Sequence, residues 1–288
     1  MNKRINIRQF FMFLLAIVMI TARPMSSFAA EDQVTAAKKG VVEINLDYID
    51  ENGDEYVITT GSGFLIDDHY AVTLAHILKP DDDVLEIYAE VFEIDEDTLL
   101  DRIIIKVCAN ERSTEASVYT SDYDTDLAVL RLDSSISGCK ALPILSSSTL
   151  TSSDDCYSLG YSSTVTQYSD PSEVITHHGV FKRIETLDGV EYVISSMDLS
   201  SGNAGGPLVD ENGSVIGVLA GQMADNSDNM ECYAISSDSL MDILDQSGTP
   251  YRNADGGNSS SGFEGPENSG SGFPSWGGAA PGGFKRLP

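Results

Sequence analysis

Basic residues are scarce in this chain of 288 residues. It has 17 lysine and arginine residues against 45 aspartate and glutamate residues, which gives a formal net charge of −28. Nucleic-acid binding needs lysine and arginine patches that neutralise phosphates, and anionic membrane surfaces attract the same residues. The shortage therefore argues against both kinds of partner, and we expect any charged partner to be basic.

Long apolar runs are also scarce. The run at residues 10–20 is shorter than the roughly 20 residues that a membrane span needs. A basic stretch at residues 3–8 precedes it, and small residues further on favour cleavage after Ala29. This pattern predicts a signal peptide over residues 1–29 and a secreted, extracellular protein, with an uncleaved anchor as the alternative. With no later apolar span and no cysteine near the cleavage site, we expect no stable membrane anchor.

Helical periodicity is rare between residues 36 and 235. About a dozen short runs there alternate apolar and polar residues, which is typical of strands. The pairs Asn52-Gly53, Asp188-Gly189 and Asn212-Gly213 are typical hairpin turns. The pattern predicts an all-β protein built as a sandwich or as barrels.

One helix is predicted near the end of the strand-rich region, over residues 237–246. Ser236 offers an N-cap, and three apolar residues at helical spacing follow, Leu240, Ile243 and Leu244. Residues 249–288 are rich in glycine and serine and lack the apolar content of a core. We expect this segment to be a disordered tail.

The densest acidic segment is residues 81–101, which hold ten aspartates and glutamates. We interpret it as a solvated acidic loop. Calcium binding is the alternative, because hard cations take several carboxylate ligands.

Three motifs follow one another along the chain. Residues 61–64 read Gly-Ser-Gly-Phe, and residues 71–76 end at His76. Residues 125–132 place Asp126 at the start of an apolar strand, and residues 202–208 form a glycine-rich turn. A histidine, then an aspartate, then such a turn is the chain order of the chymotrypsin catalytic residues.

Over roughly residues 36–245 the sequence resembles trypsin-like serine peptidases, especially secreted bacterial ones similar to the high-temperature-requirement proteases. The resemblance implies a peptidase domain over residues 30–248 with the chymotrypsin-like fold. That fold has two packed six-stranded antiparallel β-barrels, here at about residues 36–135 and 140–235, with a short C-terminal helix. We expect no second, peptide-binding domain of the kind usual in the high-temperature-requirement group.

The resemblance also assigns roles to four residues. His76 matches the general base, and Asp126 matches the carboxylate that orients it. The backbone N–H groups of Gly202 and Ala204 match the oxyanion hole. Ala204 also stands at the nucleophile position, where a serine is required, and alanine cannot form an acyl-enzyme. The residues therefore predict a protein without peptidase activity.

Other residues near this turn leave alternatives open. Ser200 and Ser201 are upstream hydroxyls that could replace the missing nucleophile, and an engineered serine-to-alanine change is another explanation. Asn203 stands where trypsin has the aspartate that pairs with a newly cut N-terminus, so no zymogen-type ion pair is expected. Asp198 has the spacing of the acid that selects lysine and arginine in trypsin, and a solvent-exposed position is its alternative.

The remaining histidines and the cysteines predict no metal site and no cofactor. Surface or barrel-wall roles are favoured for His69, His177 and His178, since the adjacent pair would face opposite sides of a strand. Cysteine occurs at four positions that match no C-x-x-C signature, Cys108, Cys139, Cys156 and Cys232. An even number in an exported chain permits two disulfides, with free thiols as the alternative. Of the possible bridges we favour Cys139–Cys156, which would close a loop of about 17 residues.

Two main functional hypotheses result. The first is an exported, inactive trypsin-like homologue that binds extended peptides or proteins. The second is an active secreted serine endopeptidase, either because another nucleophile acts or because the sequence was altered. A structural or adhesive surface protein is a third class, supported only by the glycine- and serine-rich tail. Oligomeric state and ligand identity are not encoded in any of these motifs.

Overall fold

The computed structural model describes residues 25–162, 173–225, 227–256 and 258–259. The first 24 residues of the predicted signal peptide and residues 260–288 of the predicted tail lie outside the described residues. The side chains of residues 25–30 are likewise not described.

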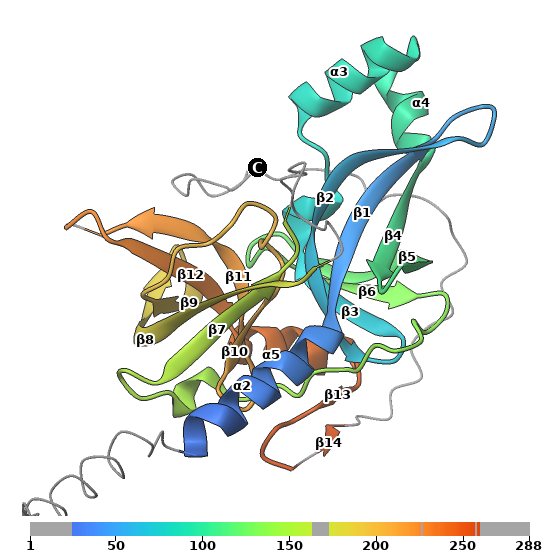
Figure 1. Ribbon diagram of the computed structural model, residues 1–288. Coiled ribbons are helices and arrows are strands. Elements are labelled where there is room, and N and C mark those ends of the chain that lie inside the picture. The colour runs from blue at the N-terminus through green and yellow to red at the C-terminus, as the bar shows by residue number, and fades with distance from the viewer. Residues whose placement is uncertain (1–24, 163–172, 226, 257, 260–288) are drawn as a thin grey trace, which may run out of the picture.

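Two closed, six-stranded barrels form the body of the protein, and all of their strand pairs are antiparallel (Figure 1). The first barrel has the order β1-β2-β3-β6-β5-β4 and comprises β1 (Val41–Ile49), β2 (Glu55–Asp67), β3 (Tyr70–Leu74), β4 (Ile103–Ala109), β5 (Arg112–Asp122) and β6 (Leu127–Leu132). The second has the order β10-β11-β12-β9-β8-β7 and comprises β7 (Asp155–Gly160), β8 (Ile175–Leu187), β9 (Val190–Ser195), β10 (Pro207–Asp210), β11 (Val215–Ala224) and β12 (Met230–Ser236). The expected chymotrypsin-like fold class is confirmed.

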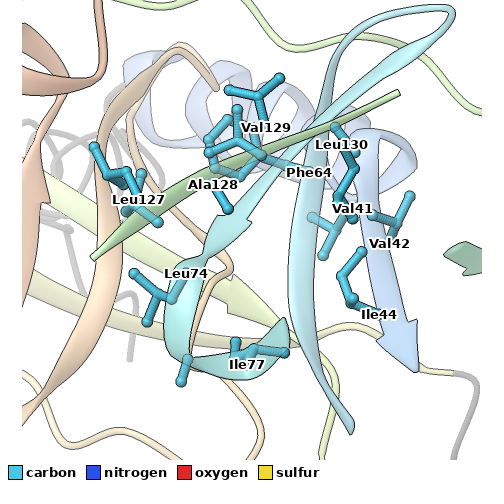
Figure 2. Packing of buried hydrophobic residues seen from close by; sticks show 14 of the residues in the cluster. Val41, Val42, Ile44, Phe64, Leu74, Ile77, Leu127, Ala128, Val129 and Leu130 are labelled. Carbon is cyan, nitrogen blue, oxygen red and sulfur yellow. The ribbon is translucent and has the colours of Figure 1, made fainter. Parts of the chain in front are cut away.

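Alternation of apolar side chains fills the barrel interiors. In β4 every second residue is buried, starting at Ile103 and ending at Ala109. Figure 2 shows the core of the first barrel, where side chains from β1, β2 and β6 meet. Phe64 and Leu130 are fully buried there. Because strand side chains alternate between faces, this pattern determines the register of each strand against its neighbours.

Hairpin turns lie where the sequence places them. Asp188 and Gly189 connect β8 to β9, and both have positive φ angles, 50° and 89°. Positive φ at both central residues is the requirement of a type I′ turn, which matches the twist of paired strands.

The predicted C-terminal helix is α5 (Ser237–Ser247). The side chain of Ser236 accepts a hydrogen bond from the backbone N–H of Ser239, as an N-cap does. Gly248 ends the helix in the left-handed conformation, with φ 70°. Leu240, Ile243 and Leu244 are buried, so their stripe faces the core.

The prediction that residues 81–101 form a solvated loop is wrong. They form two helices, α3 (Asp82–Phe92) and α4 (Glu96–Asp101), which stand beside the β1–β2 hairpin (Figure 1). Leu85, Ala89 and Leu99 are buried, which ties both helices to the first barrel. The side chain of Asp95 caps α4 by accepting from the N–H of Thr98. The acidic residues occupy the outer faces of helices whose few apolar residues reach the core.

A further helix, α2 (Met25–Ala37), crosses the predicted cleavage position after Ala29. Among the side chains described from residue 31 on, Val34 and Ala37 are the buried ones in this helix. None of the helices in the described ranges has the length and apolar content that crossing a bilayer requires.

The predicted disordered tail begins with ordered structure. Strand β13 (Tyr251–Arg252) pairs with β14 (Asn258–Ser259), and Ile144 forms a bridge to Asn253. Tyr251 is only 8% exposed, so a single aromatic residue anchors this segment. The glycine- and serine-rich composition concealed that anchor.

The predicted Cys139–Cys156 disulfide is absent, because all four cysteines are free thiols. Cys139 accepts a hydrogen bond from Asn110 after β4, whereas Cys156 is buried among the apolar residues of the second barrel. Burial raises the pKa of Cys156 and of Cys232 to about 12, so both stay protonated at neutral pH.

The helical segment supplies a stability prediction. Leu99 is fully buried, so Leu99→Ala should lower the free energy of unfolding by about 2–5 kcal/mol. Ile87 is 59% exposed on the neighbouring helix, and Ile87→Ala should change it by about 0.5 kcal/mol or less. Urea unfolding measures both variants. Equal, small effects would contradict the docking of α4 on the barrel.

Candidate active site

The histidine and aspartate motifs meet because their strands are neighbours. His76 lies in a short 3₁₀ turn (Ala75–Leu78) that follows β3, and Asp126 directly precedes β6. The antiparallel pairing of β3 with β6 places Leu74 opposite Leu127. The end of one strand and the start of the other therefore lie at the same edge of the first barrel.

Asp126 holds His76 through both of its carboxylate oxygens. Oδ2 lies 2.7 Å from the His76 Nδ1, and Oδ1 accepts from the His76 backbone N–H at 2.9 Å. A third hydrogen bond runs from the N–H of Ala75 to the carbonyl of Asp126 at 3.0 Å. A carboxylate at Nδ1 favours the tautomer with a proton there, which leaves the Nε2 lone pair free to accept a proton.

The backbone of Asp126 is strained. Its φ is 60°, in the left-handed region that costs a non-glycine residue about 1–2 kcal/mol. The hydrogen bonds to His76 and Ala75 hold this conformation in place. The sequence pattern around Asp126 does not predict this positive φ.

The charge of the Asp126 carboxylate acts on two tyrosines. Burial raises the pKa of Tyr192, from the second barrel, and the negative charge of Asp126 raises it further. Burial and Asp126 also raise the pKa of Tyr123. Both phenols therefore stay neutral around the His76–Asp126 pair at physiological pH.

The glycine-rich turn needs its glycines. Gly202 and Gly205 have φ angles of 93° and 83°. A Cβ on Gly205 would lie 2.2 Å from the backbone oxygen of Ser62, which no side chain tolerates. Asn203, fully buried, holds the turn from inside: its Oδ1 accepts from the N–H of Ser200 at 2.9 Å, and its own N–H donates back to the carbonyl of Ser200.

Ala204 sits at the tip of this turn and is 7% exposed. Its carbonyl accepts from the N–H of Ser62 at 2.9 Å. Within the described part of the chain, the N–H groups of Gly202 and Ala204 donate to no acceptor. Two unpaired amides on one turn can receive an oxygen from a bound molecule. We call His76, Asp126, Gly202 and Ala204 together the seam site.

Ser62 joins the two barrels at this point, a role that the sequence motif around it did not reveal. Its Oγ donates to the carbonyl of Gly202 at 2.6 Å and accepts from the N–H of Tyr161 at 2.8 Å. Its carbonyl accepts from the Oγ1 of Thr73 at 2.8 Å. Ser62 is fully buried, so these hydrogen bonds fix β2 against the turn that carries Ala204.

One of the two alternative hydroxyls, that of Ser200, lies near a different histidine. The Ser200 Oγ is 3.0 Å from the Nε2 of His177 on β8. His178, the next residue, faces elsewhere and contacts Asp155 at 2.8 Å. No group of three metal-ligating side chains gathers among the described residues. Asp198 is exposed on the loop before the turn, which is the alternative that the sequence left open for it. Its role in selecting lysine or arginine stays a prediction.

A paired histidine and aspartate beside a glycine-rich turn, between two antiparallel six-stranded barrels, define the chymotrypsin-like class of protein. The sequence model of the trypsin-like peptidase domain matches residues 61–218, which contain all four residues of the seam site. The chain therefore belongs to the trypsin-like peptidase domain family.

A curated relative extends the likeness beyond that range. Serine protease Do-like HtrA of Lactobacillus helveticus is 26% identical over 235 residues. The matched region covers 77% of this chain and 48% of the relative. The chain thus spans about half the length of the curated relative that it matches.

The hydrogen bonds of Ser62 generate a prediction. Ser62→Ala leaves the buried N–H of Tyr161 and the carbonyl of Gly202 without this partner, at about 1–3 kcal/mol for each group left unsatisfied. Ser117, exposed on β5, is the matched control and should tolerate alanine without measurable loss. Urea unfolding compares them, and equal stability of the two variants would refute the role of Ser62.

Proposed function

We propose that the chain is a proteolytically inactive member of its family that binds extended peptides or proteins at the seam site. The observation that carries the proposal is Ala204, which stands at the nucleophile position of a turn that otherwise keeps its shape. The His76–Asp126 pair and the unpaired amides of the turn accompany it.

The missing atom removes one step of the reaction. In an active relative of this fold, the histidine Nε2 takes a proton from the nucleophile Oγ as that oxygen attacks the peptide carbonyl. Ala204 ends in a methyl group, so His76 has no proton to take from it and no acyl-enzyme bond can form. Loss of the nucleophilic serine in another protease lowers turnover by about 10⁶.

Peptide binding does not need the missing serine Oγ. The amides of Gly202 and Ala204 are backbone groups, and alanine keeps its N–H. Strand β11 adds an open edge next to them. It pairs with β10 only as far as Val218, and Leu219 then bonds to the turn at Gly205 and Gly206.

Beyond Leu219, residues 221–224 of β11 pair with β12 alone among the described strands. An extended peptide can add itself to such an edge through backbone hydrogen bonds. The open edge continues directly from the turn of the seam site, which supports an extended ligand lying along both.

Charge favours basic ligands. A net charge of −28 attracts cations at long range, and salt screens that attraction. Asp198 lies on the loop that leads into the turn and provides an exposed carboxylate for a lysine or arginine side chain. We infer a preference for extended peptides that contain those residues.

We also infer that the protein acts outside the cytoplasm, as a secreted protein. The basic stretch, short apolar run and small-residue cleavage position at the N-terminus support this inference. Cleavage after Ala29 would leave Val34 and Ala37, two buried residues of α2, in the chain.

A second candidate function is an active serine endopeptidase. The observation in its favour is the Ser200–His177 pair, since a hydroxyl 3.0 Å from an imidazole nitrogen meets the distance requirement for an activated nucleophile. No carboxylate contacts His177 among the described residues, in contrast to His76. That missing orienting group is why we rank this function second.

One experiment separates the two functions. The protein is mixed with extended lysine- or arginine-containing peptides, and calorimetry and mass spectrometry follow binding and cleavage. We expect salt-sensitive binding, intact peptides and no labelling by a serine-directed phosphonate. Asp198→Asn should weaken binding about twofold to fivefold, the value of a partly exposed ion pair. Asp133→Asn, with the same charge change on an exposed residue of the first barrel, should not.

Two outcomes would contradict the proposal. Phosphonate labelling that maps to Ser200 and disappears in His177→Ala would establish the second function. Absence of any peptide binding by a folded protein would show that the seam site has no ligand of this class.

A further inference from the structure

Large apolar side chains are exposed at one place on the first barrel. Five large hydrophobic residues are exposed in the described part of the chain, and four of them lie on the start of β2 or on α3. We call these four the α3 apolar surface: Tyr56 (39% exposed), Val57 (51%), Ile87 (59%) and Val91 (66%).

Contacts between α3 and β2 bring these two pairs of residues to the same end of the first barrel. Ile87 and Val91 are one helical turn apart and therefore neighbours on α3. The Tyr88 hydroxyl donates to the carbonyl of Val57 at 3.3 Å, and the ring of Phe92 lies 4.9 Å from that of Tyr56. These contacts fix α3 against β2, at the protruding end of the molecule in Figure 1.

The exposed side chains of α3 itself, Ile87 and Val91, do not face the barrel. Its buried residues are Leu85 and Ala89, on the face that meets the barrel. Ile87 follows Leu85 by two positions, which turns it to nearly the opposite side of the helix. An exposed apolar group that does not face the barrel marks an interaction surface in a chain so rich in acids.

The surroundings of the surface define the charge of its partner. On the other flank of α3, a hollow of about 510 Å³ between α3 and α4 is lined by six acidic residues, Glu86, Glu90, Glu93, Asp95, Glu96 and Asp97. None of them forms an ion pair among the described residues. A second copy of the chain would bring the same acids face to face and is disfavoured.

We propose that the α3 apolar surface docks a basic amphipathic helix of another protein. Large apolar side chains of that helix would cover Ile87, Val91 and Val57, and its lysines or arginines would face the acids of α3 and α4. Laying the apolar face of an amphipathic helix on an apolar surface is a common mode of recognition. This binding site lies on the first barrel and goes beyond the proposed function of the seam site.

A designed peptide tests the proposal. The probe is a leucine–lysine peptide of about four helical turns with its leucines on one face. A scrambled peptide of the same composition, which lacks the apolar face, is the control for attraction by charge alone. Fluorescence anisotropy or calorimetry with the whole protein should show that the amphipathic peptide binds about tenfold or more tightly than the scrambled one.

Two double variants locate the site, and a third double variant is the control. Ile87→Ser/Val91→Ser should weaken binding of the amphipathic peptide about tenfold or more, because two exposed aliphatic contacts are lost. Glu86→Gln/Glu90→Gln should weaken it about threefold and reduce its salt dependence. Glu111→Gln/Glu115→Gln, the same charge change on exposed residues of the first barrel, should leave it unchanged.

The controls separate this site from the seam site. Asp198→Asn and saturation with an extended basic peptide should leave binding of the helical probe unchanged, whether or not the seam site binds anything. Equal binding of scrambled and amphipathic peptides, full binding by Ile87→Ser/Val91→Ser, or competition with the extended peptide would each overturn the proposal. A dimer that the same double variant dissolves would overturn it as well, since the occupant would be a second copy.

Discussion

The hydrogen bonds of Ser62 are the interaction on which the site depends, because they cross the boundary between the barrels. Its Oγ bonds to Gly202 and Tyr161, and its N–H bonds to Ala204. All three partners are backbone groups of the second barrel. Tyr161 directly follows β7, and Gly202 and Ala204 lie between β9 and β10. These bonds fix the turn against β2 without involving the side chain at position 204.

That independence explains how the turn can keep its shape with alanine at position 204. A serine hydroxyl at position 204 would serve the reaction only. The glycines, Asn203 and Ser62 are the residues that hold the turn. Replacing serine by alanine therefore removes an atom needed for catalysis and little that is needed for folding. Such a loss would retain the hydrogen-bonded His76 and the unpaired amides of Gly202 and Ala204. A bound peptide can use both features.

Sequence reasoning reached the features that depend on local pattern. Alternating strands, the Asp188-Gly189 turn, the cap and stripe of α5, and the order His76, Asp126, Gly202 follow from spacing and residue type. Sequence-based prediction failed where a few apolar residues decide the local structure against the overall composition of the segment. Leu85, Ala89 and Leu99 fold an acidic segment into helices, and Tyr251 orders the start of a glycine-rich tail. The left-handed φ of Asp126, the Ser62 bonds and the Ser200–His177 contact depend on long-range geometry that no local pattern encodes.

We propose that the seam site is complete except for one oxygen. Peptide hydrolysis by Ala204→Ser, compared with the parent chain and with Ala204→Ser/His76→Ala, tests it most directly. We predict that Ala204→Ser cleaves extended basic peptides at least about 10³-fold faster than the other two, since a working triad is worth up to about 10⁶. A folded Ala204→Ser protein as inert as its parent would contradict the account, as would a parent chain that already cleaves at the same rate.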